Sequence, residues 1–335
     1  MTDTLNDMQQ YLVDEFVEEY QEGHLSRREA LRQIGAIAGM TAAIVILAAC
    51  GSPQVSTTAT TDAVSTTAAI ATTVATSTPA SSASAGSALV AASADPSVQV
   101  APDDPGLTAD MMSFPGTGAT LMGYLAQPVR NSLSPIVLVC HENMGLTPYI
   151  QNVARRLAKA GYVALAVDLL GRQGGTAKVS NPGDVPGILG KLPPDQLVQD
   201  FQSGMRYLQS QPYVIKDRVG MVGFCYGGGV TWRVATKTPE LRAAVPFYGP
   251  PPAVTDIPMI QAAVLAFYGA LDTRITQSEP TIEAAMKQNN KTFEKQIYPG
   301  AGHAFHHDGG ANYNPGAAKD AWEKTLAWFK TYLRA

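Results

Sequence analysis

The chain has 335 residues, 45% of them hydrophobic and 16% charged, which is enough to bury a sizeable core in one large domain or two small ones. Residues 1–49 contain eight acidic and three basic residues, a net charge of −5, and the other 20 acidic and 21 basic residues leave +1 for the remainder. This balance gives no sign of a basic face for nucleic acid, so no nucleic-acid partner is expected.

An export signal is predicted in residues 1–49. The pair Arg27-Arg28, within Ser-Arg-Arg-Glu-Ala-Leu-Arg, resembles a bacterial twin-arginine signal, although Ala30 stands where an aromatic residue is often found. An uncharged, largely apolar run follows over residues 33–49. It is shorter than the ~20 residues of a membrane span and ends in small residues, which favours a signal over a permanent helix.

The signal ends in a second motif. The sequence LAAC at residues 47–50 resembles the lipobox of bacterial lipoproteins, in which the cysteine, here Cys50, becomes the lipidated first residue of the mature chain. The alternative is an uncleaved N-terminal anchor. Both interpretations place the rest of the chain on the extracytoplasmic face of a membrane, at the cell surface or in the periplasm. The acidic residues before Ser26 are atypical of a signal, and the sequence gives no reason for them.

Residues 50–106 are predicted to be a disordered linker. Between Ser52 and Gln99, 33 of 48 residues are Ser, Thr or Ala, and the only charged residues are Asp62 and Asp95. Such a segment has few large apolar side chains to offset the entropy lost on ordering. It would hold the folded part away from the membrane.

Residues 107–335 are predicted to form a single α/β domain. Short, continuously apolar runs alternate with longer amphipathic stretches, a pattern that indicates a mostly parallel sheet covered by helices on both faces. In open sheets of this kind, ligands bind beyond the carboxyl ends of the strands. The expected strands are residues 135–140, 162–169, 218–224, 243–249, 262–269 and 291–299, and the expected helices are residues 149–161, 194–210, 226–235 and 317–333.

Cys225 lies in the sequence MVGFCYGGG, directly after an expected strand and before an expected helix. A cysteine flanked by Gly223 and Gly227 at this place stands where the nucleophile elbow of an α/β-hydrolase would stand. The two glycines let the neighbouring backbone pass close to a strained residue. The N-terminus of the following helix is expected to lower the pKa of the thiol.

Two further polar residues follow later strands in the order that a catalytic triad of this fold requires. Asp272 follows the strand at 262–269, and His303 follows the strand that ends near Pro299. His303 would take the thiol proton and later protonate the leaving group, while Asp272 would fix the tautomer of the imidazole.

The loop after the strand at 135–140 has the sequence CHENMGL. In this architecture that loop and the residue after the nucleophile supply the two backbone N–H groups of the oxyanion hole. We assign the hole to Asn143 and Tyr226. Glu142 would then lie beside the thiol, unless it is a capping or surface acid.

Taken together, these motifs resemble the dienelactone hydrolase family, α/β-hydrolases with a cysteine nucleophile. The resemblance covers the chain from about Leu107 to its end and implies a triad of Cys225, Asp272 and His303, with Glu142 contacting the resting thiol. It also implies hydrolysis of a lactone or enol ester through an acyl-cysteine intermediate, without a metal or organic cofactor. Its motifs are HENMG (141–145), DLLGRQG (168–174), GFCYGG (223–228), GALD (269–272) and GAGHAF (300–305).

The resemblance also concerns substrate binding. Family members that act on dienelactone hold the substrate carboxylate with two arginines, and Arg172 matches the first, unless it is a surface arginine. His307 stands where the second is expected, and a histidine is mostly uncharged near pH 7. We therefore expect weaker carboxylate binding than in those members.

Thiol chemistry points to the same substrate class. A thiolate is both a good nucleophile and a good leaving group, so its tetrahedral intermediate goes forward most readily when the other leaving group is also good. Enol esters and activated lactones meet this condition. A broad carboxylesterase with the same triad and a surface lipoprotein that uses the fold only for binding remain as alternatives.

Other uses of cysteine and histidine find little support in the sequence. Three cysteines form no disulfide framework and match no CxxC spacing. His306 and His307, beside His303, do not converge on one ion, so no metal site is expected. A reversible bond between Cys140 and Cys225 stays a minor hypothesis, because the strands that carry them are predicted neighbours. The catalytic domain is expected to be a monomer that acts on a small molecule.

Overall fold

The computed structural model describes residues 5–50 and 99–334. Within them, eight strands form one sheet in the order β1-β2-β4-β3-β5-β6-β7-β8. The pairs β1–β2 and β2–β4 are antiparallel, and all later neighbours are parallel. The strands are β1 (Leu107–Gly116), β2 (Ala119–Pro128), β3 (Ser134–Cys140), β4 (Val163–Asp168), β5 (Val214–Phe224), β6 (Ala243–Phe247), β7 (Ala263–Gly269) and β8 (Phe293–Tyr298).

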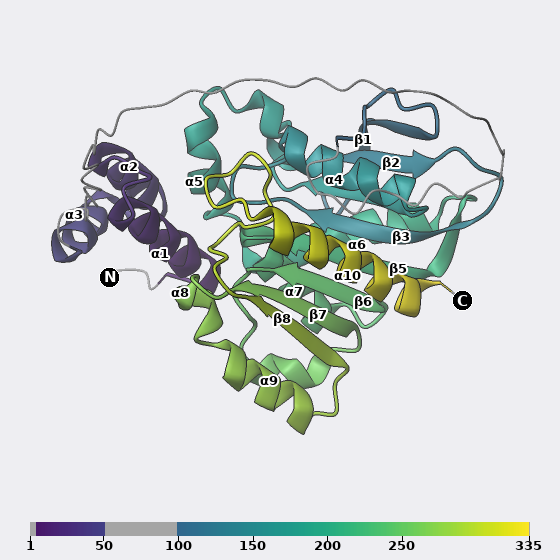
Figure 1. Cartoon of the computed structure of the whole chain (residues 1–335). Helices are drawn as coiled ribbons and strands as arrows, with labels where there is room; N and C mark the ends of the chain where they lie inside the picture. Colours follow the sequence, from purple (N-terminus) through teal and green to yellow (C-terminus); the bar gives the residue numbers. More distant parts are fainter. Residues whose placement is uncertain (1–4, 51–98, 335) are drawn as a thin grey trace, which may run out of the picture.

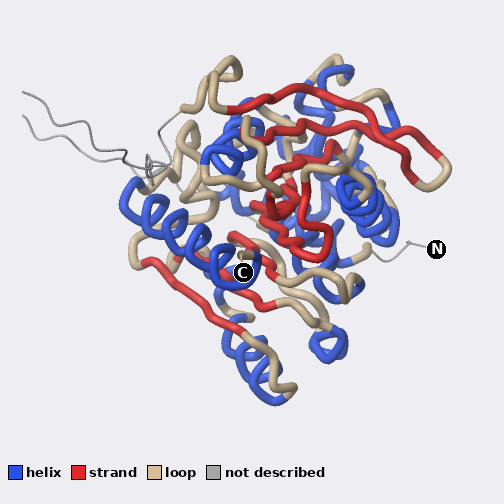
Figure 2. Tube along the Cα trace, turned by 90° about the vertical axis from the view of Figure 1, so that its right-hand side faces the viewer, coloured by secondary structure: helices blue, strands red, loops and turns tan. Residues whose placement is uncertain are grey.

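Helices cover both faces of this sheet, so the strands form a central twisted layer between them (Figure 2). The longer helices α6 (Pro194–Gln209) and α7 (Tyr226–Lys237) pack on one face, and α4 (Pro148–Lys159) and α10 (Pro315–Leu333) pack on the other. The predicted mostly parallel α/β architecture is confirmed. The shorter helices are α5 (Val185–Leu189), α8 (Thr273–Thr276) and α9 (Glu279–Gln288), with 3-10 turns η1 (Gly171–Gln173), η2 (Thr176–Lys178), η3 (Pro182–Asp184) and η4 (Val254–Met259).

The sequence pattern of the central strands explains their place. Every residue of β3, β4, β6 and β7 is buried, as expected for parallel strands with helices on both sides. In the outer strand β8, by contrast, every residue before the buried Tyr298 is partly or fully exposed. Sequence reasoning missed the hairpin of β1 and β2, because β1 is an edge strand whose apolar residues do not form a continuous run.

Three helices precede this domain: α1 (Asp7–Gln21), α2 (Arg27–Ala38) and α3 (Met40–Ala49). They lie together at one side of the sheet, next to α8 (Figure 1). Gly39, with φ of 86°, separates α2 from α3 and breaks the apolar run that the sequence placed in one signal. Within the described part of the chain, no helix combines the length and the apolar character needed to cross a membrane.

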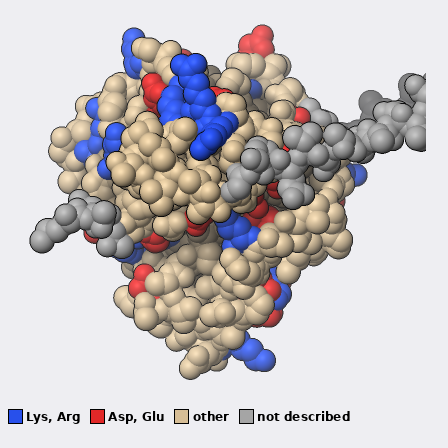
Figure 3. All heavy atoms as spheres, turned by 90° about the vertical axis from the view of Figure 1, so that its left-hand side faces the viewer, with Lys and Arg blue, Asp and Glu red and all other residues tan. Residues whose placement is uncertain are grey.

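The N-terminal helices pack against the catalytic domain. Helix α1 contacts α7, and α2 contacts α5. The face of the molecule on which they lie carries both acidic and basic side chains (Figure 3). Cys50, the predicted lipidation site, follows the last residue of α3 as its C-cap, and most of the predicted linker lies outside the described residues.

Candidate active site

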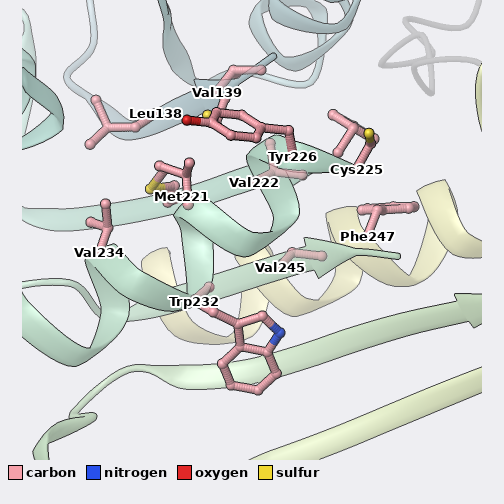
Figure 4. Packing of buried hydrophobic residues seen from close by; sticks show 14 of the residues in the cluster. Leu138, Val139, Met221, Val222, Cys225, Tyr226, Trp232, Val234, Val245 and Phe247 are labelled. Carbon is pink, nitrogen blue, oxygen red and sulfur yellow. The ribbon is translucent and has the colours of Figure 1, made fainter. Parts of the chain in front are cut away.

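Cys225 lies at the junction of β5 and α7 (Figure 4), in a backbone conformation that few residues other than glycine adopt, with φ of 55° and ψ of −120°. Two glycines make this sharp turn possible. A Cβ atom on Gly223 would lie 2.1 Å from the carbonyl oxygen of Gly227, and one on Gly227 would lie 2.4 Å from that of His141. The turn therefore presents the sulfur at the carboxyl end of the sheet, as predicted.

Asp272 and His303 follow the ends of two further strands, β7 and β8, and lie near the nucleophile. Nδ1 of His303 lies 2.6 Å from Oδ2 of Asp272, and Asp272 is almost fully buried. The other oxygen of Asp272 accepts the backbone N–H of Ile275, so Asp272 also caps α8. With Nδ1 donating to the carboxylate, Nε2 of His303 is the ring nitrogen left to accept the proton of Cys225.

Burial and charge act in opposite directions on His303. Burial favours the neutral ring and would lower its pKa, but the carboxylate of Asp272 outweighs this and raises the pKa above its usual value. Glu15 raises the pKa further, and the positive charge of Arg274 lowers it. The pair therefore stabilises the imidazolium that general-base catalysis would form.

The contacts of the Cys225 sulfur come from an unexpected part of the chain. The thiol donates to Oε1 of Glu15 at 3.2 Å, and the hydroxyl of Tyr11 lies 3.4 Å from the sulfur and 3.3 Å from Nε2 of His303. Both residues belong to α1, which sequence reasoning had not connected with the site. The only sequence signal was the unexplained run of acidic residues before Ser26.

The expected lowering of the Cys225 pKa is wrong for this state of the protein. Burial raises the pKa of the thiol well above its usual value, and the charges of Glu15 and Glu142 raise it further. The hydrogen bonds from Tyr11 and from the N–H of Tyr226 act in the opposite direction but do not compensate. The thiol is therefore held in its protonated form.

Glu142 and His307 form an ion pair with each other. Oε2 of Glu142 lies 2.8 Å from Nδ1 of His307, whose ring stacks on Tyr149 at 4.2 Å. The contact of Glu142 with the resting thiol is thus not observed, because Glu15 occupies that place. Burial would lower the pKa of His307, but the bond to Glu142 raises it, so His307 keeps its positive charge to higher pH than the sequence suggested.

The two residues assigned to the oxyanion hole lie beside the nucleophile. Tyr226 is the first residue of α7, whose initial N–H groups have no acceptor within the helix. Asn143 lines the same cavity as Cys225, and its side-chain amide donates to Oε1 of Glu15 at 2.9 Å. The side chain of His141 holds the loop in place, since its Nε2 accepts the N–H of Leu169.

Arg172, the expected carboxylate ligand, is engaged elsewhere. Its guanidinium pairs with the buried Asp200, with Nη2 at 2.6 Å from Oδ1, and also donates to the carbonyl oxygen of Thr117. Arg172 is not among the residues that line the cavity at Cys225. The structure therefore does not bring it together with the other predicted site residues.

A cavity of about 530 Å³ opens beside Cys225. No lysine or arginine occurs among the described residues that line it, and its acidic lining includes four glutamates of the N-terminal segment. A larger hollow of about 690 Å³ lies at the amino ends of the strands, near Lys216 and Arg242, and contains no predicted site residue. The lining of the first cavity also includes the predicted site residues Glu142, Asn143, Cys225, Asp272, His303 and His307.

The fold brings together one group of side chains of the kinds that can bind a metal ion. Oε1 of Glu15, Sγ of Cys225 and Nε2 of His303 lie within 4.8 Å of one another, the only such group in the described part of the chain. An ion there would occupy both the nucleophile and its base. His306 points elsewhere, since its Nδ1 is 2.6 Å from the Tyr149 hydroxyl.

The three cysteines are free thiols in the structure. Residues Cys140 and Gly223 are partners in the parallel register of β3 and β5, which confirms that the strands carrying Cys140 and Cys225 are neighbours. Cys140 is fully buried in the core, where burial raises its pKa. It therefore behaves as an apolar core residue in this state.

Comparison with known proteins agrees with this geometry. A family model described as "Dienelactone hydrolase family" matches residues 121–333. A protein of Methylorubrum extorquens named "Putative carboxymethylenebutenolidase" is 32% identical over 70% of this chain and 84% of its own length. A Bradyrhizobium protein named "Probable 2-oxo-3-(5-oxofuran-2-ylidene)propanoate lactonase" is 32% identical over 68% and 96%. Among solved structures, a "Putative Dienelactone Hydrolase" from Klebsiella pneumoniae superposes with a TM-score of 0.63 and 33% identity, over 68% of this chain and 99% of that one.

Proposed function

Because the chain belongs to the dienelactone hydrolase family, we propose that it hydrolyses lactones or activated esters through an acyl-cysteine intermediate. The observation that carries this proposal is the strained backbone of Cys225 together with the hydrogen-bonded pair of Asp272 and His303 beside it. A turn of this kind costs conformational energy that a purely structural cysteine would not require.

The residues suggest how the reaction proceeds. Nε2 of His303 takes the thiol proton, and the sulfur of Cys225 attacks the carbonyl carbon. The N–H groups of Tyr226 and Asn143 stabilise the resulting oxyanion. When the carbon–oxygen bond of the ester breaks, His303 returns the proton to the leaving oxygen. Water, deprotonated by His303, then attacks the thioester, and the thiol is released.

The cavity supports a preference for uncharged substrates over carboxylates. Arg172 is paired with Asp200, Arg274 with Glu18, and His307, which lines the cavity, is neutralised by Glu142. A substrate carboxylate would have to compete with Glu142 for His307 and would meet the charge of that glutamate. This charge distribution favours a second candidate function within the same reaction class, that of a broad carboxylesterase with no preference for substrates that carry a carboxylate.

A substrate panel tests the proposed function. We expect the full-length chain carrying Leu12→Pro, which breaks helix α1 over the site, to form a covalent acyl adduct with a neutral aryl ester, a neutral enol lactone and a carboxylated enol lactone, located on Cys225 by peptide mass spectrometry. The neutral substrates should give the higher kcat/KM. Preference for the carboxylated lactone would contradict the inferred selectivity, and no adduct with any of the three substrates would contradict the hydrolase proposal.

The export of the protein and its attachment to a membrane are a separate proposal. We propose that the mature protein is exported and held by lipid on Cys50, which the LAAC motif supports. Replacing Cys50 with serine should leave an unprocessed or released protein, because serine offers no thiol for lipidation. Membrane fractionation and intact mass measure this, with Ser52→Ala as the control outside the motif. An unchanged membrane fraction and mass in Cys50→Ser would exclude lipidation at this residue.

A further inference from the structure

Helix α1 lies over the opening of the candidate active site. Asn6 caps it through a reciprocal pair of hydrogen bonds with Gln9, so the helix has a defined start. Its buried face carries large apolar side chains that pack into the core of the protein. The buried residues of this face are Met8, Tyr11, Leu12, Val13, Glu15, Phe16 and Tyr20. An export signal has no need of a face that fits a folded enzyme.

Ion pairs hold both ends of α1 on the catalytic domain. Asp7, at the first turn, pairs with Arg233 of α7. Glu18, near the last turn, pairs with Arg274 of α8 at 3.0 Å, and the same guanidinium lies 4.7 Å from the centre of the Tyr11 ring. The charges on the two partners are complementary, since the acids lie on α1 and the arginines on the domain.

The middle of α1 occupies the reacting groups themselves. Tyr11 lies between the sulfur of Cys225 and Nε2 of His303, the two atoms between which the proton must pass. Glu15 accepts the thiol proton in a hydrogen bond and also engages the side chain of Asn143. While these two side chains remain, a carbonyl carbon has little access to the sulfur, because Cys225 is only 3% exposed.

The charge of Glu15 also keeps the nucleophile unreactive. A carboxylate 3.2 Å from the sulfur opposes formation of a thiolate, and the thiolate is the reactive form of cysteine. The docked state, in which α1 lies on the catalytic domain, costs free energy because it buries charged atoms. Oε2 of Glu15 and Oε1 of Glu142 are buried without a hydrogen-bond partner among the described residues. A segment bound in this way is suited to release.

We propose that helix α1 is an inhibitory pro-segment, an intramolecular ligand that fills the active site until residues 1–49 leave the protein. The proposal rests on the function proposed above for the same site. It accounts for the acidic residues before Ser26, and it links activity to processing, since cleavage before Cys50 would remove α1, α2 and α3 in one piece. The hydrolase would thus stay inactive during synthesis and become active at its destination.

The titratable groups around α1 make the strength of the inhibition depend on pH. Burial and the charge of Glu15 raise the pKa of Glu19 to about 7, with Glu22 acting in the same direction and His303 and Arg274 against it. Burial and the charge of Glu15 also raise the pKa of Cys225 in the docked state. Docking therefore takes up protons, so it is strongest in acid and weakens as pH rises through about 7.

The test measures the reactivity of Cys225 in the full-length chain. Leu12, fully buried at the centre of α1, is replaced by proline, which removes a helical hydrogen bond and breaks the helix. Labelling of Cys225 by iodoacetamide is followed by peptide mass spectrometry. If α1 is displaced in about 1% of wild-type molecules, its release should raise the labelling rate about 100-fold. Hydrolysis of a neutral aryl ester should rise with it.

A second variant tests the contacts without breaking the helix. Tyr11→Phe combined with Glu15→Gln keeps the size of both side chains and removes the hydroxyl and the charge at the sulfur. Gln10→Ala is the matched control on the solvent side of α1, and circular dichroism and thermal unfolding check that the catalytic domain remains folded. The ratio of labelling rates between Leu12→Pro and wild type should fall as pH rises through about 7.

The outcomes separate this proposal from the proposed function. Faster labelling in either variant than in Gln10→Ala supports the pro-segment, even where no ester is hydrolysed, and in that case only the hydrolase proposal fails. Wild-type labelling rates in both variants, with the domain folded, would overturn the pro-segment and identify α1 as a permanent wall of the site.

Discussion

Replacing Cys225 with alanine should reduce kcat/KM for a neutral aryl ester by about 10⁴-fold or more, and no acyl adduct should form. The reason is that the sulfur is the only atom of the strained turn that can bond to the carbonyl carbon. The oxyanion hole and the imidazole of His303 remain in this variant, but they can only assist attack by water. The rate is measured in the Leu12→Pro background, so that α1 does not mask the effect, with Leu12→Pro alone as the reference.

Two matched variants make this result specific. Cys140→Ala removes the other buried thiol of the domain and should keep most of the activity, because Cys140 packs in the core at the neighbouring strand. Cys225→Ser keeps the geometry of the turn and should show a low residual activity, since a hydroxyl is far harder to deprotonate than a thiol. Full activity in Cys225→Ala would remove the acyl-cysteine mechanism and favour attack by an activated water.

Replacing Asp272 with asparagine should lower kcat by roughly 10⁴-fold, the loss found for the equivalent change in a serine triad. With an amide in place of the carboxylate, His303 is no longer held in the tautomer whose unprotonated Nε2 is available to the sulfur. It also removes the charge that raises the pKa of His303. Catalysis needs the neutral ring, so the acid limb of the pH–rate profile should move to lower pH.

The control for this variant is Asp256→Asn, an exposed aspartate in η4 that makes no contact with His303. Asp272 also caps α8, so part of any loss could come from the cap, and thermal unfolding measures that part. A fall in stability together with an unchanged pH–rate profile would show that Asp272 acts only as a cap. A shifted profile with a folded protein would assign it to His303.

The chemistry of the site could be predicted from sequence because its signals are local or follow chain order. A cysteine between glycines after an apolar strand indicates a strained turn, and the glycines are needed because their neighbours lie too close for a Cβ. The order of Cys225, Asp272 and His303 along the chain follows from the order of parallel strands. Because parallel strands share one carboxyl edge, residues at their ends meet there.

The partners of long, charged side chains could not be predicted in the same way. Arg172 has the expected position in its motif but reaches Asp200, 28 residues later on another element. Glu142 reaches His307 and leaves the thiol to Glu15. A charged side chain pairs with whichever opposite charge or donor the folded chain places within a few ångströms, and this is set by packing rather than by spacing along the chain.

The sequence by itself determined the α/β fold, the turn at Cys225 and the residues available for an acyl-transfer triad. These follow from apolar periodicity, from the sterics of glycine and from strand order, which the linear chain contains. Only the tertiary structure decided that α1 covers the site and that the thiol is held protonated. Cys225 and Glu15 are 210 residues apart, so their contact arises when an amphipathic helix finds an apolar surface on a domain that has already folded. Hydrophobic burial is not directional, and the sequence of α1 therefore shows that it must pack, without showing where.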